Sequence, residues 1–358
     1  MQITLKNPLD MHLHLRDGAL LDVVTPFSAK SFAAAVIMPN LTPPIDSLHK
    51  AQAYKQAIKD SIHNYAKAHK QPLESFEPLC ALYLSDSLTP KELESCAKHG
   101  FKLLKLYPKG ATTNSDNGIA QVLDSKSYEI FSAAQELGII LCIHGESGGF
   151  VLEREMEFGA IFRELATRFP NLKIIIEHIS DHRTIPLLEE YDNLYATLTL
   201  HHITLDLSNL AGGALCHHHF CKPVLKTPKD KQALLDLALN AHSKVCFGSD
   251  SAPHSLEAKQ KGAAGIFSAV GLLPQLAELF HKHNALHNLQ AFVSDNAMKI
   301  YDLACWVQAA QAWEDNPKLI TLEQAPYKIP ESIRVLDSNL TPLRAGEMIA
   351  WREIESKA

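Results

Sequence analysis

Two histidines and an arginine alternate along the first apolar stretch of the chain. His12, His14 and Arg16 occupy every second position of the segment DMHLHLRDG, residues 10–18. Alternate residues of a β-strand project from the same face, so these three side chains are expected to point the same way. Two neighbouring imidazoles can begin a metal site. A polar edge strand with incidental histidines would give the same pattern.

Further ionisable residues stand at the ends of later apolar runs. Lys105 lies among apolar neighbours, while His144, His178 and Asp250 each follow a short run rich in branched or aromatic residues. A lysine is costly to bury in its charged form, so Lys105 is expected to be paired or modified. If the runs are parallel strands, all these residues lie at the end where barrel enzymes build their sites. The repetition along the chain therefore predicts a metal site.

The apolar runs alternate with stretches of helical pattern. Strands are predicted over residues 9–15, 33–38, 79–84, 102–106, 139–143, 173–176, 195–199 and 244–247. Helices are predicted over residues 47–69, 90–99, 125–137, 152–169, 184–191 and 229–241. This alternation indicates βαβ units, and eight strands indicate an α/β fold of the (β/α)8 TIM-barrel type. An open doubly wound sheet is the alternative, although no Gly-x-Gly-x-x-Gly follows the first strand.

The pattern changes after residue 250. Helices are predicted over residues 271–283 and 286–293, and short strands over 318–322, 333–336 and 348–351. Proline and glycine separate these last pieces. We interpret residues 318–358 as a small C-terminal appendage on a single domain that spans residues 1–358.

The composition is that of an ordinary globular protein. The chain has 358 residues, of which 46% are hydrophobic and 21% charged, with a net charge of −6. The acidic balance argues against a nucleic-acid binder. No apolar run has the length of a membrane span, and residues 1–10 lack the apolar core of a signal peptide. The seven cysteines include no Cys-x-x-Cys pair, which favours the cytoplasm over a disulfide-forming compartment.

Six segments carry a more specific signal in combination. They are DMHLHLRDG at 10–18, MPNLTPP at 38–44, KLYPKGATTNS at 105–115, HGE at 144–146, EHI at 177–179 and GSDSAPH at 248–254. Together they resemble the dihydroorotases of the amidohydrolase superfamily, and best the short single-domain bacterial type. The segments span most of the predicted barrel.

The resemblance implies two Zn²⁺ ions held by six residues: His12, His14, Lys105, His144, His178 and Asp250. His12 and His14 would bind one ion, and His144 and His178 the other. Lys105, carboxylated by carbon dioxide, would bridge both ions, because a carbamate offers the oxygen ligands that an ammonium lacks. Asp250 would complete the first site and also move the reacting proton.

The implied reaction is the reversible cyclisation of N-carbamoyl-L-aspartate to (S)-dihydroorotate and water, a step of UMP synthesis. Arg16, Asn40 and His254 match the positions that bind the free carboxylate of this small substrate, and His144 is also counted among the substrate contacts. For Arg16, a structural ion pair is the alternative.

Main-chain contacts and a lid are implied as well. Lys222 and Ala264 match positions whose backbone touches the pyrimidine ring, although the family carries leucine where this chain has Lys222. Residues 109–115 resemble a loop whose paired threonines, here Thr112 and Thr113, reach over the linear substrate. An ordinary solvent loop is the alternative for this segment.

Other interpretations of the sequence compete with this one. Residues 145–149 resemble a protease nucleophile loop, but that fold is all-β. His217–His219 between two cysteines form either a second metal site or a solvated loop, and Asn40 begins a glycosylation sequon. A hydantoinase, an allantoinase, a metal-storage protein or an inactive scaffold remain alternative functions. The oligomeric state is left open, with a homodimer among the choices.

Overall fold

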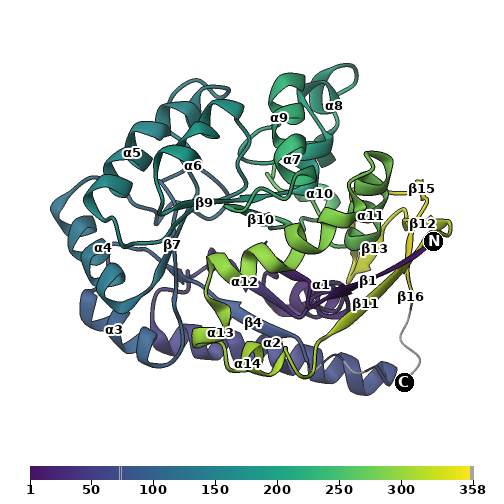
Figure 1. The fold of residues 1–358 in the computed structure, drawn as a ribbon, viewed down its shortest axis with the longest axis horizontal. Helices are drawn as coiled ribbons and strands as arrows, with labels where there is room; N and C mark the ends of the chain where they lie inside the picture. The colour runs from purple at the N-terminus through teal and green to yellow at the C-terminus, as the bar shows by residue number, and fades with distance from the viewer. Residues whose placement is uncertain (72, 74, 355–358) are drawn as a thin grey trace.

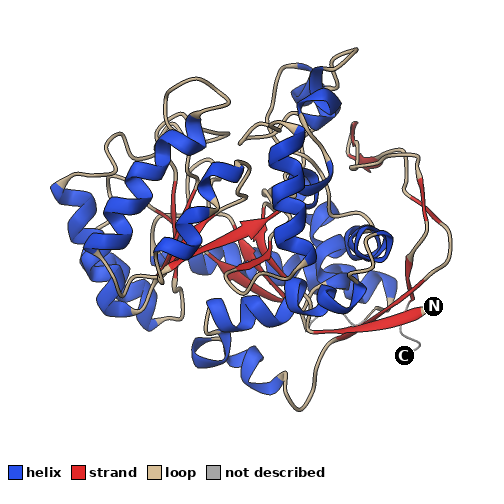
Figure 2. Cartoon of the chain, turned by 45° about the horizontal axis from the view of Figure 1, so that its top comes forward, coloured by secondary structure: helices blue, strands red, loops and turns tan. Residues whose placement is uncertain are grey.

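Parallel strands form the centre of the molecule, and helices surround them (Figures 1 and 2). The computed structural model describes residues 1–71, 73 and 75–354. One parallel sheet has the order β2–β3–β4, with bounds Leu9–Leu13, Ala34–Ile37 and Glu77–Cys80. The second has the order β10–β9–β8–β7–β6–β5. Its strands are Val245–Phe247, Leu194–Leu198, Ile174–Ile176, Ile140–Ile143, Leu103–Leu106 and Leu82–Tyr83.

The two parallel sheets approach each other at both ends. β4 and β5 are separated only by Ala81, whose amide donates to the carbonyl of Ile37 at 3.0 Å. At the other end, Leu13 and Ser251 form a parallel bridge, and the amide of Asp250 donates to the carbonyl of His12 at 2.8 Å. All eight predicted strands are thus found, the third of them divided in two.

Continuous apolar strands are explained by two separate packing partners. Ile37, Leu104 and Leu141 belong to the larger hydrophobic cluster, which includes the surrounding helices. Their neighbours Val36 and Leu103 belong to a second cluster with residues of the helices near position 300. Because both faces of these strands are covered, neither face needs polar residues.

The six predicted crossover helices are present. They are α2 (Leu48–His69), α3 (Pro90–Lys98), α4 (Ser125–Leu137), α5 (Arg154–Arg168), α6 (Pro186–Glu190) and α9 (Pro228–Leu239). Several begin where a side chain caps the first turn: Ser47 accepts from Lys50, Thr89 from Glu92 and Asp124 from Ser127. Such caps satisfy amides that have no partner inside the helix.

Three α-helices before residue 250 had no sequence prediction. They are α1 (Gly18–Ser31), α7 (Leu200–Thr204) and α8 (Leu207–Ala211). α1 contains Pro26, which normally argues against a helix interior, and α7 and α8 are only five residues long. Tertiary packing therefore overrides the local signal in these places.

The region after residue 250 is helical, with one irregular segment. α10 spans Leu256–Gln260. α11 spans Leu272–Lys282 and confirms the helix predicted over 271–283. The segment predicted as a helix over 286–293 is helical but irregular: the chain forms a 3-10 turn at Leu286–Asn288 and a π-helical turn at Ala291–Asp295. Three short helices follow: α12 (Asn296–Ile300), α13 (Leu303–Trp306) and α14 (Gln308–Ala312). Neither these three helices nor α10 had a sequence prediction. The side chain of Asn296 donates to the carbonyls of residues 241, 242 and 245, which ties this irregular segment to the start of β10.

The two ends of the chain share an antiparallel sheet away from the central strands (Figure 1). β1 (Gln2–Lys6) pairs with β11 (Leu319–Glu323), which also pairs with β16 (Arg352–Ile354). Two small pairs complete this region: β12 (Tyr327–Lys328) with β15 (Met348–Ile349), and β13 (Ile333–Val335) with β14 (Ser338–Leu340). β1 had no prediction, and it joins the segment that the sequence analysis treated as C-terminal.

Two further observations concern the cysteines and the possibility of a membrane-spanning helix. All seven cysteines are free thiols. Within the described residues, no helix combines the length and the apolar character needed to cross a membrane.

Candidate functional site

The six predicted metal ligands lie close together at the carboxyl ends of the parallel strands. His12 lies on β2 and Lys105 on β6. His14 and His144 directly follow β2 and β7, and His178 and Asp250 come two and three residues after β8 and β10. All six side chains are buried. Except for Lys105, they line one cavity together with Arg16, Asn40, Tyr107, Thr112, Thr113, Lys222, Ala252, Ala264 and Gly265.

One half of the cluster joins the first and last parallel strands. A carboxylate oxygen of Asp250 lies 3.1 Å from Nε2 of His14 and 3.5 Å from Nε2 of His12. Ligand atoms of these three residues all lie within 4.8 Å of one another. Burial lowers the pKa of His14 to about 4, so its imidazole is neutral near pH 7 and has a lone pair to offer. The three residues could hold one metal ion.

The backbone at this point differs from the predicted strand. β2 ends at Leu13, not at residue 15, so His14 and Arg16 do not continue a regular alternation. Arg16 has a φ of 62°, which turns the chain out of the strand, and His178 and Asp250 have φ values of 41° and 42°. Left-handed backbone at residues other than glycine is costly and gathers at functional sites.

The other half of the cluster consists of His144, His178 and the nearby Lys105. Nδ1 of His144 faces Nε2 of His178 at 3.2 Å. Burial lowers the pKa of both imidazoles, that of His178 strongly. Lys105 is fully buried, burial lowers the pKa of its amine, and within the described residues its Nζ makes no hydrogen bond. Such an orphaned nitrogen is rare in a folded interior and needs a partner that the protein alone does not supply.

The buried carboxylates of Glu177 and Glu146 contact His12 and His144 on the ring nitrogens that do not face the other predicted ligands. Oε2 of Glu177 lies 2.7 Å from Nδ1 of His12 and also accepts from the hydroxyl of Thr197 at 2.6 Å. Oε2 of Glu146 lies 2.7 Å from Nε2 of His144. In each case the bonded nitrogen is the one facing away from the neighbouring ligand atom, as expected for carboxylate-oriented metal ligands.

The sequence analysis gave these glutamates no role. The available signal was their position, because Glu146 stands two residues after a predicted ligand and Glu177 stands directly before one. Burial alone would raise the pKa of Glu177, but His12, Lys105 and the hydrogen bonds to its carboxylate lower it overall. Glu177 is therefore an anion that favours a donating Nδ1–H on His12.

Of the three predicted carboxylate-binding residues, Arg16 and Asn40 line the cavity, and His254 contacts Arg16. Nη2 of Arg16 lies 3.1 Å from Nε2 of His254, and Nε of Arg16 donates to the carbonyl of Pro253. Among the described residues, no carboxylate pairs with Arg16, which removes the structural ion pair as its explanation. The amide nitrogen of Asn40 donates to the carbonyl of Thr113 at 3.0 Å, while its Oδ1 is buried without a partner.

The segment with the paired threonines contacts this side of the cavity. Thr113 donates from its hydroxyl to the carbonyl of Ala264 at 3.3 Å, and the side chain of Asn114 donates to the carbonyl of Asn40 at 3.0 Å. Thr112 and Thr113 both line the cavity, as do Lys222 and Ala264. Of the predicted site residues, all but Lys105 and His254 line this cavity, and His254 contacts Arg16 and Ala264, which do.

The competing motifs do not form rival sites. Ser147, in the protease-like segment, donates to Glu157, and it does not line the cavity. His217–His219 form a 3-10 turn where a loop was expected. Asn40 is 2% exposed, so the sequon is inaccessible. A further buried group, formed by His201, His202 and Cys221, had no prediction.

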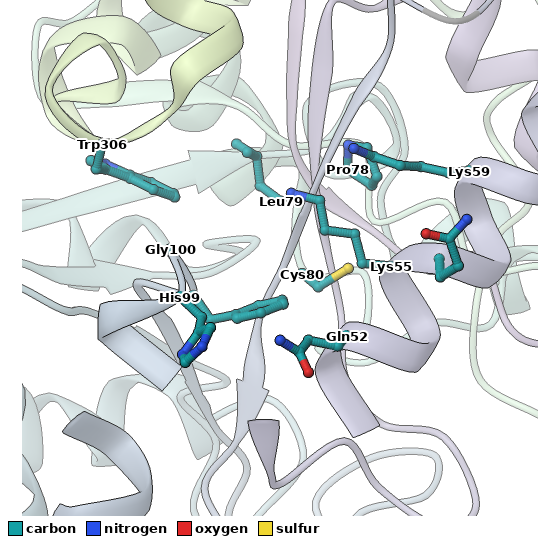
Figure 3. Close-up of a pocket in the computed structure, with 11 residues that line it drawn as sticks. Gln52, Lys55, Lys59, Pro78, Leu79, Cys80, His99, Gly100 and Trp306 are labelled. Atoms are coloured by element: carbon teal, nitrogen blue, oxygen red, sulfur yellow. The ribbon is translucent and has the colours of Figure 1, made fainter. Parts of the chain in front are cut away.

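A larger cavity lies elsewhere and lacks this chemistry (Figure 3). It is lined by one side of α2, by residues 78–80, by residues 99–101 and by Trp306. Its two lysines, Lys55 and Lys59, are both within 4.0 Å of the carboxylate of Glu77. The histidine-lined cavity is therefore the candidate functional site.

Comparisons with known proteins show the family of the chain. The family model described as amidohydrolase matches residues 10–303. The dihydroorotase of Helicobacter hepaticus is 51% identical over 98% of this chain and 97% of its own length. Dihydroorotases of several Helicobacter pylori strains are 48% identical over 98% of both chains.

Solved structures give the same result. The crystal structure of a dihydroorotase from Campylobacter jejuni has a TM-score of 0.88 and 41% identity, covering 98% of this chain and 97% of that one. A dihydroorotase from Saccharomyces cerevisiae, in complex with 5-fluoroorotic acid, has a TM-score of 0.87 and 34% identity, covering 99% and 98%. The L-hydantoinase of Arthrobacter aurescens shares the fold, with a TM-score of 0.76, but only 15% identity. From its full-length relatives, the chain belongs to the dihydroorotase family of the amidohydrolases.

Proposed function

We propose that this chain catalyses the reversible cyclisation of N-carbamoyl-L-aspartate to dihydroorotate and water, using two metal ions. Its dihydroorotase relatives match almost the whole chain. The observation that carries the proposal is the joint placement of Asp250, four buried histidines and Arg16 around one cavity. A metal-storage protein would have no use for the guanidinium of Arg16, and a hydantoin has no free carboxylate for it to bind.

The donor set fits a pair of Zn²⁺ ions. His12, His14 and Asp250 would hold one ion, and His144 and His178 the other, with Lys105 as the bridge. The Lys105 amine supports this role, because it is buried without a hydrogen-bond partner in the described residues and burial lowers its pKa, and an unprotonated amine can attack carbon dioxide to give a carbamate with loss of a proton. When bound, the ions polarise the reacting carbonyl and acidify water.

The residues of the chain then bind the substrate and move its proton. Arg16, Asn40 and His254 would bind the free carboxylate, with Lys222 and Ala264 beside the ring. In the cyclising direction the ureido nitrogen attacks the carbon of the protonated side-chain carboxyl, and Asp250 would carry the proton that the nitrogen loses to the hydroxyl, which leaves as water. In the hydrolytic direction Asp250 takes that proton back.

The proposal also covers the closure of the barrel, the extent of the domain, the cellular location and the oligomeric state. We propose that the two parallel sheets close into one eight-stranded barrel, in a single domain spanning residues 1–358, with residues 318–358 as its C-terminal appendage. The bridge between Leu13 and Ser251 supports the closure. Free cysteines support a cytoplasmic location. Light scattering of the purified protein would distinguish a monomer from a homodimer.

One experiment tests the function as a whole. Purified protein is assayed for turnover of dihydroorotate and of N-carbamoyl-L-aspartate, and bound metal is counted on the same sample. Hydantoin and allantoin serve as control substrates. Turnover of the control substrates alone would contradict the proposal, and a metal-loaded protein without any turnover would favour the inactive scaffold.

Glu177→Gln is predicted to weaken metal binding without unfolding the protein. The amide keeps the size of the side chain but removes the negative charge that orients His12. Loss of such a partner typically costs about 10–100-fold in metal affinity. The measurement is a chelator-competition titration, with the exposed Glu136→Gln as the matched control. Parental metal affinity in Glu177→Gln would contradict the orienting role.

The double variant Thr112→Ala/Thr113→Ala is predicted to lose most turnover of N-carbamoyl-L-aspartate, about 10²-fold if the linear substrate is misplaced. Neither threonine is a predicted ligand, so metal content and melting temperature should stay at parental values. Steady-state kinetics in the cyclising direction provide the measurement. A parental rate would mean that residues 109–115 are only a connection between elements.

A further inference from the structure

Lys259 is a buried lysine that the proposed chemistry does not use. It lies on α10 and is only 4% exposed. No carboxylate in the described part of the chain lies within 4.0 Å of its ammonium. Burial lowers the pKa of Lys259 to about 8, so the side chain is still mostly charged at pH 7. An ammonium held without a counter-ion is costly, and its hydrogen bonds must account for its retention.

Both of its hydrogen bonds go to backbone carbonyls of the segments that line the cavity. Nζ donates to the carbonyl of Phe220 at 2.8 Å and to that of Gly265 at 2.6 Å. The amide of Gly265 also donates to the carbonyl of Phe220 at 2.9 Å. One charged group thus joins residues 220–222 to residues 262–265.

These two segments contribute Lys222, Ala264 and Gly265 to the wall of the cavity, and none of the three is a predicted metal ligand. Lys222 and Ala264 line the cavity, and neither of their amide nitrogens donates to another group in the described residues. The carbonyl of Ala264 accepts from His254 at 2.9 Å and from Thr113 at 3.3 Å. These segments therefore offer the amides of Lys222 and Ala264 as hydrogen-bond donors to a ligand. The carbonyl of Ala264 also holds His254 and Thr113, which are predicted substrate contacts.

We propose that Lys259 is a positioning residue that fixes this wall, called here the ring wall (residues 220–222 and 262–265), for recognition of the amide groups of the cyclic substrate. The inference rests on the proposed function, since it assigns the ring of dihydroorotate to this wall. Lys259 itself touches no substrate. Its effect passes through the placement of the main chain of Lys222 and Ala264.

The test compares Lys259→Met with Lys259→Arg and with Lys261→Met, using the metal-loaded full-length chain. Lys261 is an exposed lysine two residues away and controls for the loss of a positive charge. The readouts are kcat and KM for dihydroorotate, metal content, melting temperature and the Kd of 5-fluoroorotic acid measured by calorimetry. That compound probes the wall without turnover.

Lys259→Met is expected to raise KM and the Kd about tenfold or more, with kcat within about threefold of the parent and unchanged metal content. Lys259→Arg, which keeps the charge and its donors, should recover most of the affinity, and Lys261→Met should behave as the parent. If Lys259→Met fails to fold, Lys259→Gln replaces it. Its amide keeps two donors without the charge, and the same rise in KM is expected.

Three results would overturn the inference. One is parental KM and Kd in the Met or Gln variant. Another is a parallel loss of kcat, metal and melting temperature, which would make Lys259 a general stability residue. The last is failure of both neutral variants to fold. Absence of dihydroorotate turnover in the parent would instead reject the proposed function.

Discussion

Lys105→Ala is expected to leave the protein without its metal and without measurable turnover. The side chain is fully buried among potential ligands, and its nitrogen has no hydrogen-bond partner in the described residues. If its carbamate bridges the two ions, alanine removes a ligand from both. Metal analysis of the purified variant and a dihydroorotate assay on the same sample provide the measurement.

Two controls make this prediction specific. Lys91→Ala, at an exposed position on α3, should keep metal and activity. Short carboxylic acids in the buffer should partly restore both in Lys105→Ala, because they can occupy the place of the carbamate oxygens. Stoichiometric metal in Lys105→Ala without added acid would show that Lys105 is not a bridge.

Asp250→Ala is expected to lose nearly all turnover in both directions. Loss of a positioned acid or base alone costs about 10² to 10⁴ in rate, and here a metal ligand is lost as well. Metal content separates the two roles of Asp250. Loss of one metal ion together with the loss of turnover would indicate that Asp250 is a ligand. Full metal content with low turnover would indicate that Asp250 transfers the proton. Near-parental kcat in Asp250→Ala would reject both roles, and Asp192→Ala, exposed before β9, serves as control.

The central strands could be predicted from sequence because burial on both faces leaves runs with few polar residues. Lys105 stood out for the same reason, as a charge inside such a run. The prediction of 9–15 as one strand was too long, since periodicity carries no information on the left-handed turn at Arg16. α1 was missed because Pro26 suggests a break that packing against α2 overcomes.

The partners of the ligands were harder to predict than the ligands. Glu146 and Glu177 differ from surface glutamates only through contacts made by folding. Lys259 is a lysine in a polar stretch of sequence, and only the structure shows that its ammonium reaches residues 220 and 265. Long-range hydrogen bonds of this kind leave no periodic signal in the chain.

The pairings between the first and last strands also bear on how the chain can fold as it is made. β1 needs β11, and β2 meets the segment after β10, so the N-terminal strands must wait for partners that leave the ribosome much later. His12 and His14 gain Asp250 only at that stage. The predicted metal-ligand cluster can therefore be completed only after residue 250 has been made, and nascent chains that stop before it lack one of the six ligands.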